Sequence, residues 1–145
     1  QERGAVVVEV ELKCPPGNIV DIRRAMLLDL RERRRKFPRK QPNCGSVFLS
    51  TSAMHASVGP PGKIIEEAGL KGLRCGAAEI STQHANFILN LGGASSADVL
   101  RLISRIRSEI RKQLGFDLCC EVRYVSPAGE ICPADQVADR LFPTD

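Results

Sequence analysis

One segment of the sequence, residues 95–115, constrains the fold more than any other because it carries every local signal of a long amphipathic helix. Ser95 and Asp98 have the spacing of a capping box, and Gly115 is a residue type that commonly ends helices. Between these ends, apolar residues recur along one helical face: Val99, Ile103, Ile106, Ile110 and Leu114. Because such a helix buries its apolar face against another layer, the chain is expected to build a packed core.

A second long helix is predicted nearer the N-terminus. Asn18 is a favourable N-cap, and Pro38 ends the helical pattern. The apolar stripe of this helix consists of Ile19, Ile22, Met26 and Leu30. Residues 31–40, at its C-terminal end, carry seven basic side chains and one acidic side chain. This basic segment is interpreted as a solvated helix face, and an anion-binding surface is the alternative.

The other periodic segments are short, and most of them predict strands. In residues 5–13, apolar and charged residues alternate, which is the pattern of a strand with one face in water. A short helix is expected at 62–68, ended by Gly69. Further short strands are expected at 46–49, 73–80, 87–89 and 118–125. This order of elements predicts the fold class α+β, with a small mixed sheet and two long helices packed on it.

The chain is expected to contain one domain and a tail. With 145 residues, it is long enough to bury a core without disulfides. The domain is expected to span residues 1–126. Residues 127–145 are expected to form an acidic C-terminal tail with little core, because Pro, Gly and acidic residues are frequent there.

The composition excludes several classes of protein. The apolar fraction of 43% and the charged fraction of 26% are typical of globular domains and not of disordered chains. No apolar run approaches the roughly 18 residues that a membrane-spanning helix needs, and no signal peptide opens the chain. Aromatic residues make up only 4%, which argues against a stacking platform for nucleic acid. Neither a membrane nor a nucleic acid is therefore expected as a partner.

The cysteines favour a reducing compartment. There is no C-x-x-C pair, and both histidines lie far from any cysteine cluster, so no metal site is expected. The thiols are expected to be reduced and to serve as small core residues of a cytoplasmic protein. They are Cys14, Cys44, Cys75, Cys119, Cys120 and Cys132.

Two positions are candidates for chemistry, although no phosphate-binding loop or hydrolase motif occurs. Ser46 lies beside Gly45 where a loop leads into apolar residues, and glycine lets a ligand approach the backbone closely. Glu121 lies in the predicted strand 118–125, and if its two neighbours share one face, Glu121 and Arg123 share the other. An ordinary loop serine and an ordinary surface pair are the alternatives.

Five segments, taken together and in this order, resemble a known family. They resemble the C-terminal, substrate-binding domain of bacterial UDP-N-acetylenolpyruvoylglucosamine reductase, also called UDP-N-acetylmuramate dehydrogenase, in its shorter form. The resemblance covers about residues 5–126. The segments are Gly45-Ser46-Val47-Phe48, residues 62–72, His84-Ala85-Asn86-Phe87, Ala97-Asp98-Val99-Leu100 and Glu121-Val122-Arg123.

The resemblance implies a specific activity. The family is a flavoenzyme of peptidoglycan biosynthesis in which NADPH reduces a bound FAD, and the flavin passes a hydride to the enolpyruvyl double bond of a UDP-sugar. By motif, Ser46 matches the family's proton donor and Glu121 matches its catalytic glutamate, so the two must meet in space although 75 positions separate them. Gly45, Ser50 and Arg123 are expected to contact the UDP-sugar.

The sequence departs from the family pattern at two places near these residues. The family usually has Lys-Asn-Pro after its Ser-Val-Phe stretch, where this chain has Leu49, Ser50 and Thr51. Loss of a cation and an amide there should weaken contact with the UDP-sugar. The family also usually has Glu-Pro before Glu-Val-Arg, where this chain has Cys119 and Cys120.

The family's flavin-binding domain precedes this region, and the residues before Val6 are too few to contain it. The chain alone is therefore predicted to be inactive and to need a flavin domain of the same or another polypeptide, with residues 1–13 as the end of that domain. Two other functions stay open. One is a non-catalytic homologue that binds another nucleotide or a protein, and the other is a nucleic-acid-binding module led by residues 31–40.

Overall fold

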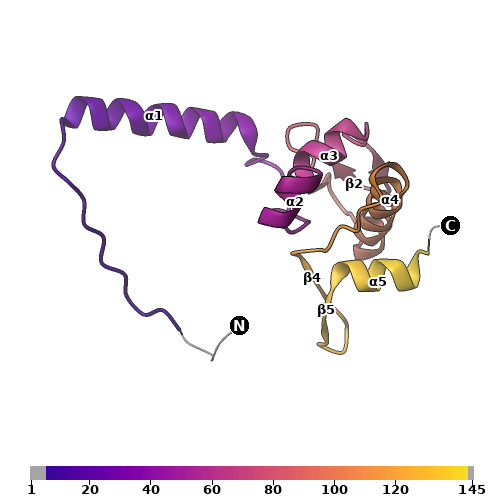
Figure 1. Ribbon diagram of the computed structural model, residues 1–145. Helices are drawn as coiled ribbons and strands as arrows, with labels where there is room; N and C mark the ends of the chain where they lie inside the picture. Colours follow the sequence, from indigo (N-terminus) through magenta and orange to yellow (C-terminus); the bar gives the residue numbers. More distant parts are fainter. Residues whose placement is uncertain (1–5, 144–145) are drawn as a thin grey trace. The chain divides into compact units, whose positions relative to one another are not determined.

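The computed structural model describes residues 6–143, which divide into two units between residues 33 and 34 (Figure 1). The second unit combines helices with two small antiparallel sheets, β1-β2-β3 and β4-β5, so the predicted α+β class is confirmed. The expected mixed sheet is replaced by these two antiparallel ones. Beyond α1 (Ile19–Lys36), the elements are α2 (Ser52–Ser57), α3 (Pro61–Glu67), β1 (Arg74–Cys75), β2 (Ala78–Ile80), β3 (Ile88–Asn90), α4 (Ser96–Leu114), β4 (Arg123–Val125), β5 (Ile131–Pro133) and α5 (Ala134–Leu141).

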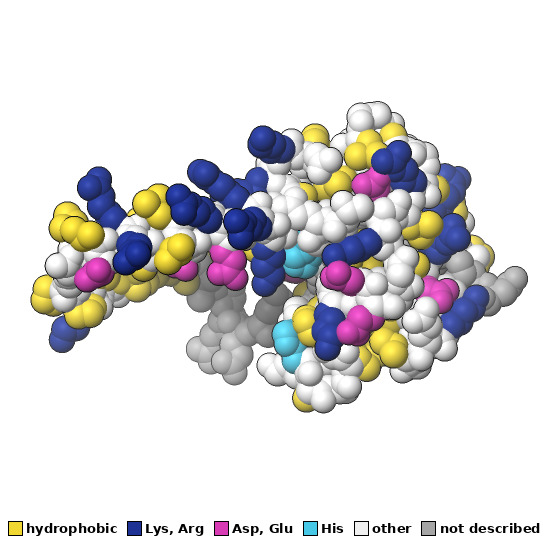
Figure 2. Space-filling model, turned by 90° about the horizontal axis from the view of Figure 1, so that it is seen from above, with side chains coloured by type: hydrophobic (Ala, Val, Ile, Leu, Met, Phe, Trp, Pro, Cys, Tyr) yellow, Lys and Arg dark blue, Asp and Glu magenta, His cyan; other side chains and the backbone are white. Residues whose placement is uncertain are grey.

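Helix α1 forms where its sequence pattern predicts it. The Asn18 side chain accepts a hydrogen bond from the N–H of Val20 at 2.9 Å, as expected of an N-cap. No residue of α1 is buried, and Figure 2 shows its hydrophobic side chains uncovered among Lys and Arg. Of the two long helices, α4 packs on a sheet as expected. Neither α1 nor any other helix among residues 6–143 is long and apolar enough to cross a bilayer.

The strand predicted at residues 5–13 is wrong for residues 6–13, which are extended but pair with no other strand of the described chain. Residue 5 lies outside the described part. Val8, in the middle of the alternating pattern, is 94% exposed. A strand forms only when a neighbour accepts and donates its backbone hydrogen bonds, and the described chain supplies none here.

Helix α4 carries the core. The Ser95 hydroxyl accepts from the Asp98 N–H at 3.2 Å, and the Asp98 carboxylate accepts from the Ser95 N–H at 3.0 Å, so the predicted capping box is confirmed. Gly115 ends the helix in the left-handed region with φ +63°. The buried face of α4 contacts β1, β2, α3 and α5. Its largest fully buried side chains are Leu102, Ile103, Ile106 and Ile110.

The segment predicted as one strand at 73–80 is a tight hairpin, in which Cys75 pairs with Ala78. Gly76 turns the chain at φ +53°, and a Cβ there would lie 2.6 Å from the Asp98 carboxylate. The turn therefore needs glycine both for its backbone conformation and for space. The expectation at 87–89 is confirmed within one residue, since β3 is Ile88–Asn90 and pairs with β2.

Two further segments differ from expectation. At 46–49 only Phe48 forms a strand-like pairing, and at 118–125 the strand itself begins at Arg123.

Helix α2 was not predicted, and the Thr51 hydroxyl caps it by accepting from the Met54 N–H at 3.2 Å. The short helix expected at 62–68 is confirmed as α3, which Gly69 follows at φ +73°.

The expected acidic tail with little core is wrong. Within residues 127–143 the chain forms β5 and α5, and α5 packs against α4. Ala134, Val137 and Ala138, spaced as one helical face, are buried. This short apolar face was hard to recognise in the sequence because acidic residues lie between and beside its members. One of the acidic residues of α5, Asp139, pairs with a buried arginine of α4.

The cysteines are all free thiols, but they are not uniformly core residues. Cys120 is buried, and Cys75 and Cys132 are partly buried against the core. The expectation of core packing is wrong for the exposed thiols of Cys14, Cys44 and Cys119. The general tendency of cysteine to be buried therefore predicted the position of only some of these thiols.

Candidate functional site

The loop that carries Ser46 is shaped by the side chain of Asn43. Its amide nitrogen donates to the carbonyl oxygens of Pro38 at 3.0 Å and Gln41 at 2.8 Å. Its amide oxygen accepts from the Gly45 N–H at 3.0 Å, which closes an Asx turn. Gly45 has φ +84°, and nothing lies within 4 Å of the position that a Cβ would occupy. Half-buried Ser46 is thus presented at an open, locally fixed turn.

Asn86 holds the next residues of this loop. Its side-chain oxygen accepts from the Phe48 N–H at 2.9 Å, and its side-chain nitrogen donates to the Phe48 carbonyl at 3.0 Å. Its backbone carbonyl accepts from the Val47 N–H at 2.9 Å. The buried side-chain amide therefore pairs both backbone groups of Phe48, as a neighbouring strand would. We refer to residues 45–48 as the serine loop.

The segment that carries Glu121 runs antiparallel to the serine loop and its continuation. Phe48 pairs with Cys120, and the Leu49 N–H donates to the Cys119 carbonyl at 2.9 Å. The Glu121 N–H donates to the carbonyl of Val47, the residue after Ser46, at 2.8 Å. The tertiary structure therefore brings together the two chain segments that hold Ser46 and Glu121.

The pairing ends in a bulge at Glu121. The N–H of Val122 also points at the Val47 carbonyl, at 3.4 Å, so two consecutive donors meet one acceptor. Val122 is partly buried, whereas Glu121 and Arg123 are exposed. Exposed and partly buried side chains therefore alternate along this segment, as expected.

The remaining residues with expected substrate contacts separate into two places. Arg123 lines a shallow groove with Cys44, Val122 and Tyr124, beside the first turn of α4. Gly45 directly follows Cys44 of this lining. Ser50 lies in a different depression, where its hydroxyl is 2.6 Å from the Nε2 atom of His55.

The buried thiol between Cys119 and Glu121 is not a nucleophile at neutral pH. Burial, with the Asp135 carboxylate nearby, raises the pKa of Cys120 to about 12. The neighbouring protein atoms remove enough water from Cys44 to raise its pKa as well, although its side chain is exposed overall. Both thiols are therefore protonated at neutral pH, where a thiolate would be the reactive form.

His84, close in sequence to Asn86, has a packing role. Its ring stacks on Phe37 at a centroid distance of 5.2 Å and meets Phe87 edge-on at 5.0 Å. A Cβ at Gly62 would lie 2.8 Å from the ring, so glycine admits His84 against α3. Burial is the main cause that lowers the pKa of His84.

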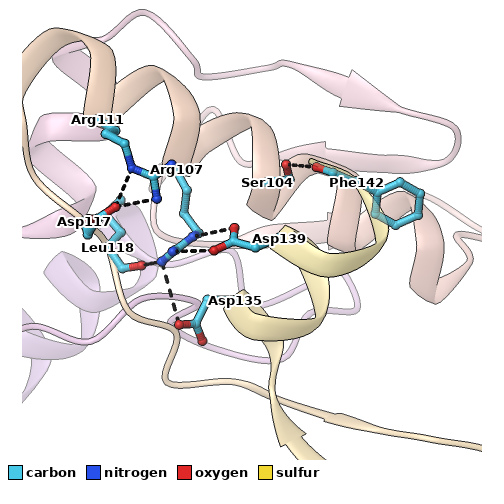
Figure 3. A network of polar contacts seen from close by, with 8 residues as sticks. All are labelled: Ser104, Arg107, Arg111, Asp117, Leu118, Asp135, Asp139 and Phe142. Carbon is cyan, nitrogen blue, oxygen red and sulfur yellow. Dashed lines mark hydrogen bonds and ion pairs between the residues drawn. The ribbon is translucent and has the colours of Figure 1, made fainter. Parts of the chain in front are cut away.

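Arg107, a charged residue of α4 outside its predicted apolar stripe, was not singled out from the sequence. Its side chain is only 8% exposed and pairs with Asp139 and Asp135 of α5 (Figure 3). Burial lowers the pKa of this guanidinium, but the hydrogen bond and charge of Asp139 and the charge of Asp135 outweigh it, so the pKa is raised. The available signal was helical spacing, since Arg107 lies four residues after Ile103 and therefore beside the apolar face.

The role of Asn86 in holding the backbone of the serine loop was also missed. Its segment contributed to the family resemblance, but a polar residue between two apolar ones gives no sign of which backbone it binds. Among residues 6–143, no three His, Cys, Asp or Glu side chains gather as metal ligands.

Comparison with known proteins agrees on one family. A family model described as UDP-N-acetylenolpyruvoylglucosamine reductase, C-terminal domain, matches residues 37–125. The chain is 54% identical over 137 residues to UDP-N-acetylenolpyruvoylglucosamine reductase 1 of Corynebacterium glutamicum. The aligned region covers 94% of this chain and 41% of that protein. It is 42% identical over 120 residues to UDP-N-acetylenolpyruvoylglucosamine reductase of Moorella thermoacetica, and this alignment covers 83% of this chain and 38% of that protein.

A solved structure is similar as well. The crystal structure of UDP-N-acetylenolpyruvylglucosamine reductase from Thermus caldophilus matches with a TM-score of 0.52 and 37% sequence identity. This match covers 68% of the present chain and 33% of that one. The chain spans about two fifths of the length of the curated relatives it matches.

Proposed function

The chain belongs to the family of UDP-N-acetylenolpyruvoylglucosamine reductase C-terminal domains, and on this premise we propose that it is the substrate-binding and proton-donating part of such a reductase. The proposed reaction is the reduction of UDP-N-acetylglucosamine enolpyruvate to UDP-N-acetylmuramate in cytoplasmic peptidoglycan synthesis. The observation that carries the proposal is the hydrogen bond between the Glu121 N–H and the carbonyl of Val47, which adjoins Ser46.

Reduction of the enolpyruvyl group needs a proton donor. FAD, bound on another part of the reductase and reduced by NADPH, would supply the hydride. Addition of hydride to C3 leaves negative charge that spreads from C2 into the carboxylate, and C2 must then gain a proton. Ser46 donates its hydroxyl proton to C2, and Glu121 orients the intermediate or assists this transfer. The half-buried position of Ser46 on a loop held by Asn86 supports this role, because proton transfer needs a fixed donor.

Substrate contacts are proposed for Gly45, Arg123 and Ser50. The open space at Gly45 supports close approach of the sugar to the backbone, and the guanidinium of Arg123 supplies a cation for an acidic group. Ser50 already has a side-chain partner in His55, so its contact requires exchange of that hydrogen bond.

The groove beside the serine loop does not fit FAD. Its lining holds one cation, Arg123, and no glycine-rich turn that would cradle a diphosphate. We therefore place the flavin on another part of the reductase, in the same or another polypeptide. The alternating residues 6–13 and the uncovered apolar stripe of α1 support a packing role against that part.

The test is turnover of the reductase that contains this domain and a flavin-binding part. Ser46→Ala is expected to lower kcat by about 10²–10⁴-fold with little change in KM, because general acid catalysis contributes that much. Reduction of the flavin by NADPH should be unchanged, because Ser46 acts only in the later protonation of C2, and an unchanged KM shows that this domain is folded. Ser57→Ala, in exposed α2, is the matched control. Unchanged turnover of Ser46→Ala overturns the proton-donor role.

A non-catalytic homologue is the second candidate, favoured by Leu49-Ser50-Thr51 and by the Ser50–His55 hydrogen bond at the position of the family's Lys-Asn-Pro. Calorimetric titration of the chain with UDP-N-acetylglucosamine enolpyruvate separates the two candidates. Micromolar affinity counts against the non-catalytic candidate, whereas no detectable binding by folded protein favours it.

A further inference from the structure

Arg107 joins three parts of the second unit through one buried guanidinium (Figure 3). Its Nη1 atom donates to the carbonyl of Leu118, in the segment that leads to Glu121. Its Nε and Nη2 atoms donate to the two carboxylate oxygens of Asp139, at 3.2 and 2.9 Å. Asp135, a second carboxylate of α5, lies 3.7 Å from Nη1. The guanidinium thus ties α4, α5 and the segment before Glu121 to one point.

The Leu118 carbonyl is the first of a series of held backbone groups. The next carbonyl, that of Cys119, accepts from the Leu49 N–H at 2.9 Å, and the Glu121 N–H donates to Val47 at 2.8 Å. The segment is therefore held by Arg107 at its start and by the serine loop and Leu49 along the rest. Any shift of the Leu118 carbonyl moves the residues that precede Glu121.

The geometry of the guanidinium makes Asp139 important for this contact. The five donors of an arginine lie in one rigid plane, so a carboxylate that holds Nε and Nη2 also fixes the direction of Nη1. Asp139 accepts from two of the three guanidinium nitrogens, and the third nitrogen, Nη1, donates to the Leu118 carbonyl. The α5 carboxylate therefore aims the arginine at the Glu121 segment.

The carboxylates that hold Arg107 lie outside the part of the chain that the family model matches. That match covers residues 37–125, whereas Asp135 and Asp139 belong to α5. Helix α5 therefore reaches the Glu121 segment from beyond the matched residues in two ways. Its carboxylates hold Arg107, and the N–H of Ala134 donates to the Val122 carbonyl at 3.3 Å.

We propose that Arg107 is a positioning residue for Glu121, and that Asp139, supported by Asp135, holds it in place. The importance of this position for turnover rests on the proposed function, but the positioning itself does not. The ordinary alternative is a clamp that only attaches α5 to α4. The positioning role and this alternative differ in which backbone hydrogen bonds weaken when the contacts of Arg107 are removed.

Hydrogen exchange of backbone amides distinguishes these two roles. The reporters are the N–H groups of Leu49 and Glu121, which bond across the pairing beside the clamp. The references are the N–H groups of Ser81 and Leu91, which bond within the β1-β2-β3 region. A positioning role predicts faster exchange at the reporters alone.

Arg107→Lys keeps the charge but loses the planar fork, and we expect exchange about tenfold faster at the reporters, as for loss of a hydrogen bond to a charged group. Asp139→Asn should act in the same direction with a smaller effect and keeps the test valid if the arginine variant does not fold. The control is Glu67→Gln, which removes the charge from the exposed pair with Lys63 on α3. It should leave all four amides unchanged.

Equal acceleration at reporters and references, or no acceleration, overturns the proposal. In the complete reductase, Arg107→Lys should lower kcat with little change in KM, as expected if Glu121 is displaced while the substrate groove is intact. If exchange changes as expected but Glu121→Gln leaves turnover unchanged, the proposed function fails and the positioning of this segment stands.

Discussion

Helices α1 and α4 have almost the same length, 18 and 19 residues, and both have a polar cap and an apolar stripe, yet their surroundings differ completely. Eight residues of α4 are buried, whereas none of α1 is. Local signals therefore predict that each helix forms, but not whether anything covers its stripe. The difference teaches that periodicity identifies the face that can be buried, while burial itself depends on sequence-distant elements.

The largest contrast is expected for apolar truncation. Ile106→Ala removes a side chain that is 1% exposed, so it should lower the free energy of unfolding by about 2–5 kcal/mol. Met26→Ala, on the stripe of α1, should change it by less than about 0.5 kcal/mol, because that side chain is already in water. Urea unfolding of both variants measures this. Equal losses would mean that α1 packs in solution, and the contrast would fail.

The arginines of the two helices should differ next. Arg107→Ala leaves the Asp135 carboxylate without its cation in a mostly buried place, so we expect a loss of about 3 kcal/mol. Arg24→Ala on exposed α1 should be close to neutral. Thermal unfolding compares them. A neutral Arg107→Ala would show that the buried network contributes no net stability.

The N-caps should give a smaller contrast. Ser95→Ala removes half of the capping box and should cost about 1 kcal/mol in the main unfolding transition. Asn18→Ala should reduce helix content of α1 by circular dichroism without moving that transition. A shift of the main transition by Asn18→Ala would show that the two units unfold together.

The smallest expected effect is the pH dependence of the α4 cap. Hydrogen bonds from the Ser95 N–H and hydroxyl lower the pKa of Asp98 below its usual range near 4. The folded form thus binds the proton less readily than the unfolded form. Its stabilisation is complete above the usual pKa and is lost as the pH falls through the lowered one. Asp98→Asn should flatten the Tm profile below about pH 4, and an unchanged slope would contradict this.

The candidate site was partly predictable. Ser46 and Glu121 were identified by motif, and the structure brings their segments together through the Val47 carbonyl. Asn86 and Arg107, which hold these segments, were not identified as holding groups. A side chain that binds a distant backbone carbonyl or N–H needs only the right position in space, and no local pattern records that position.

By itself, the sequence determined the approximate ends of α1 and α4 and the face each could bury, because caps, glycine conformation and helical spacing act within a few residues. Only the tertiary structure decided which faces were covered, because burial requires a partner distant in sequence. It packed one face of α5 against α4, although the charge pattern had suggested a tail there, and no residue of α1 is buried. It also placed Glu121 against the serine loop, because antiparallel pairing joins segments that no local rule connects.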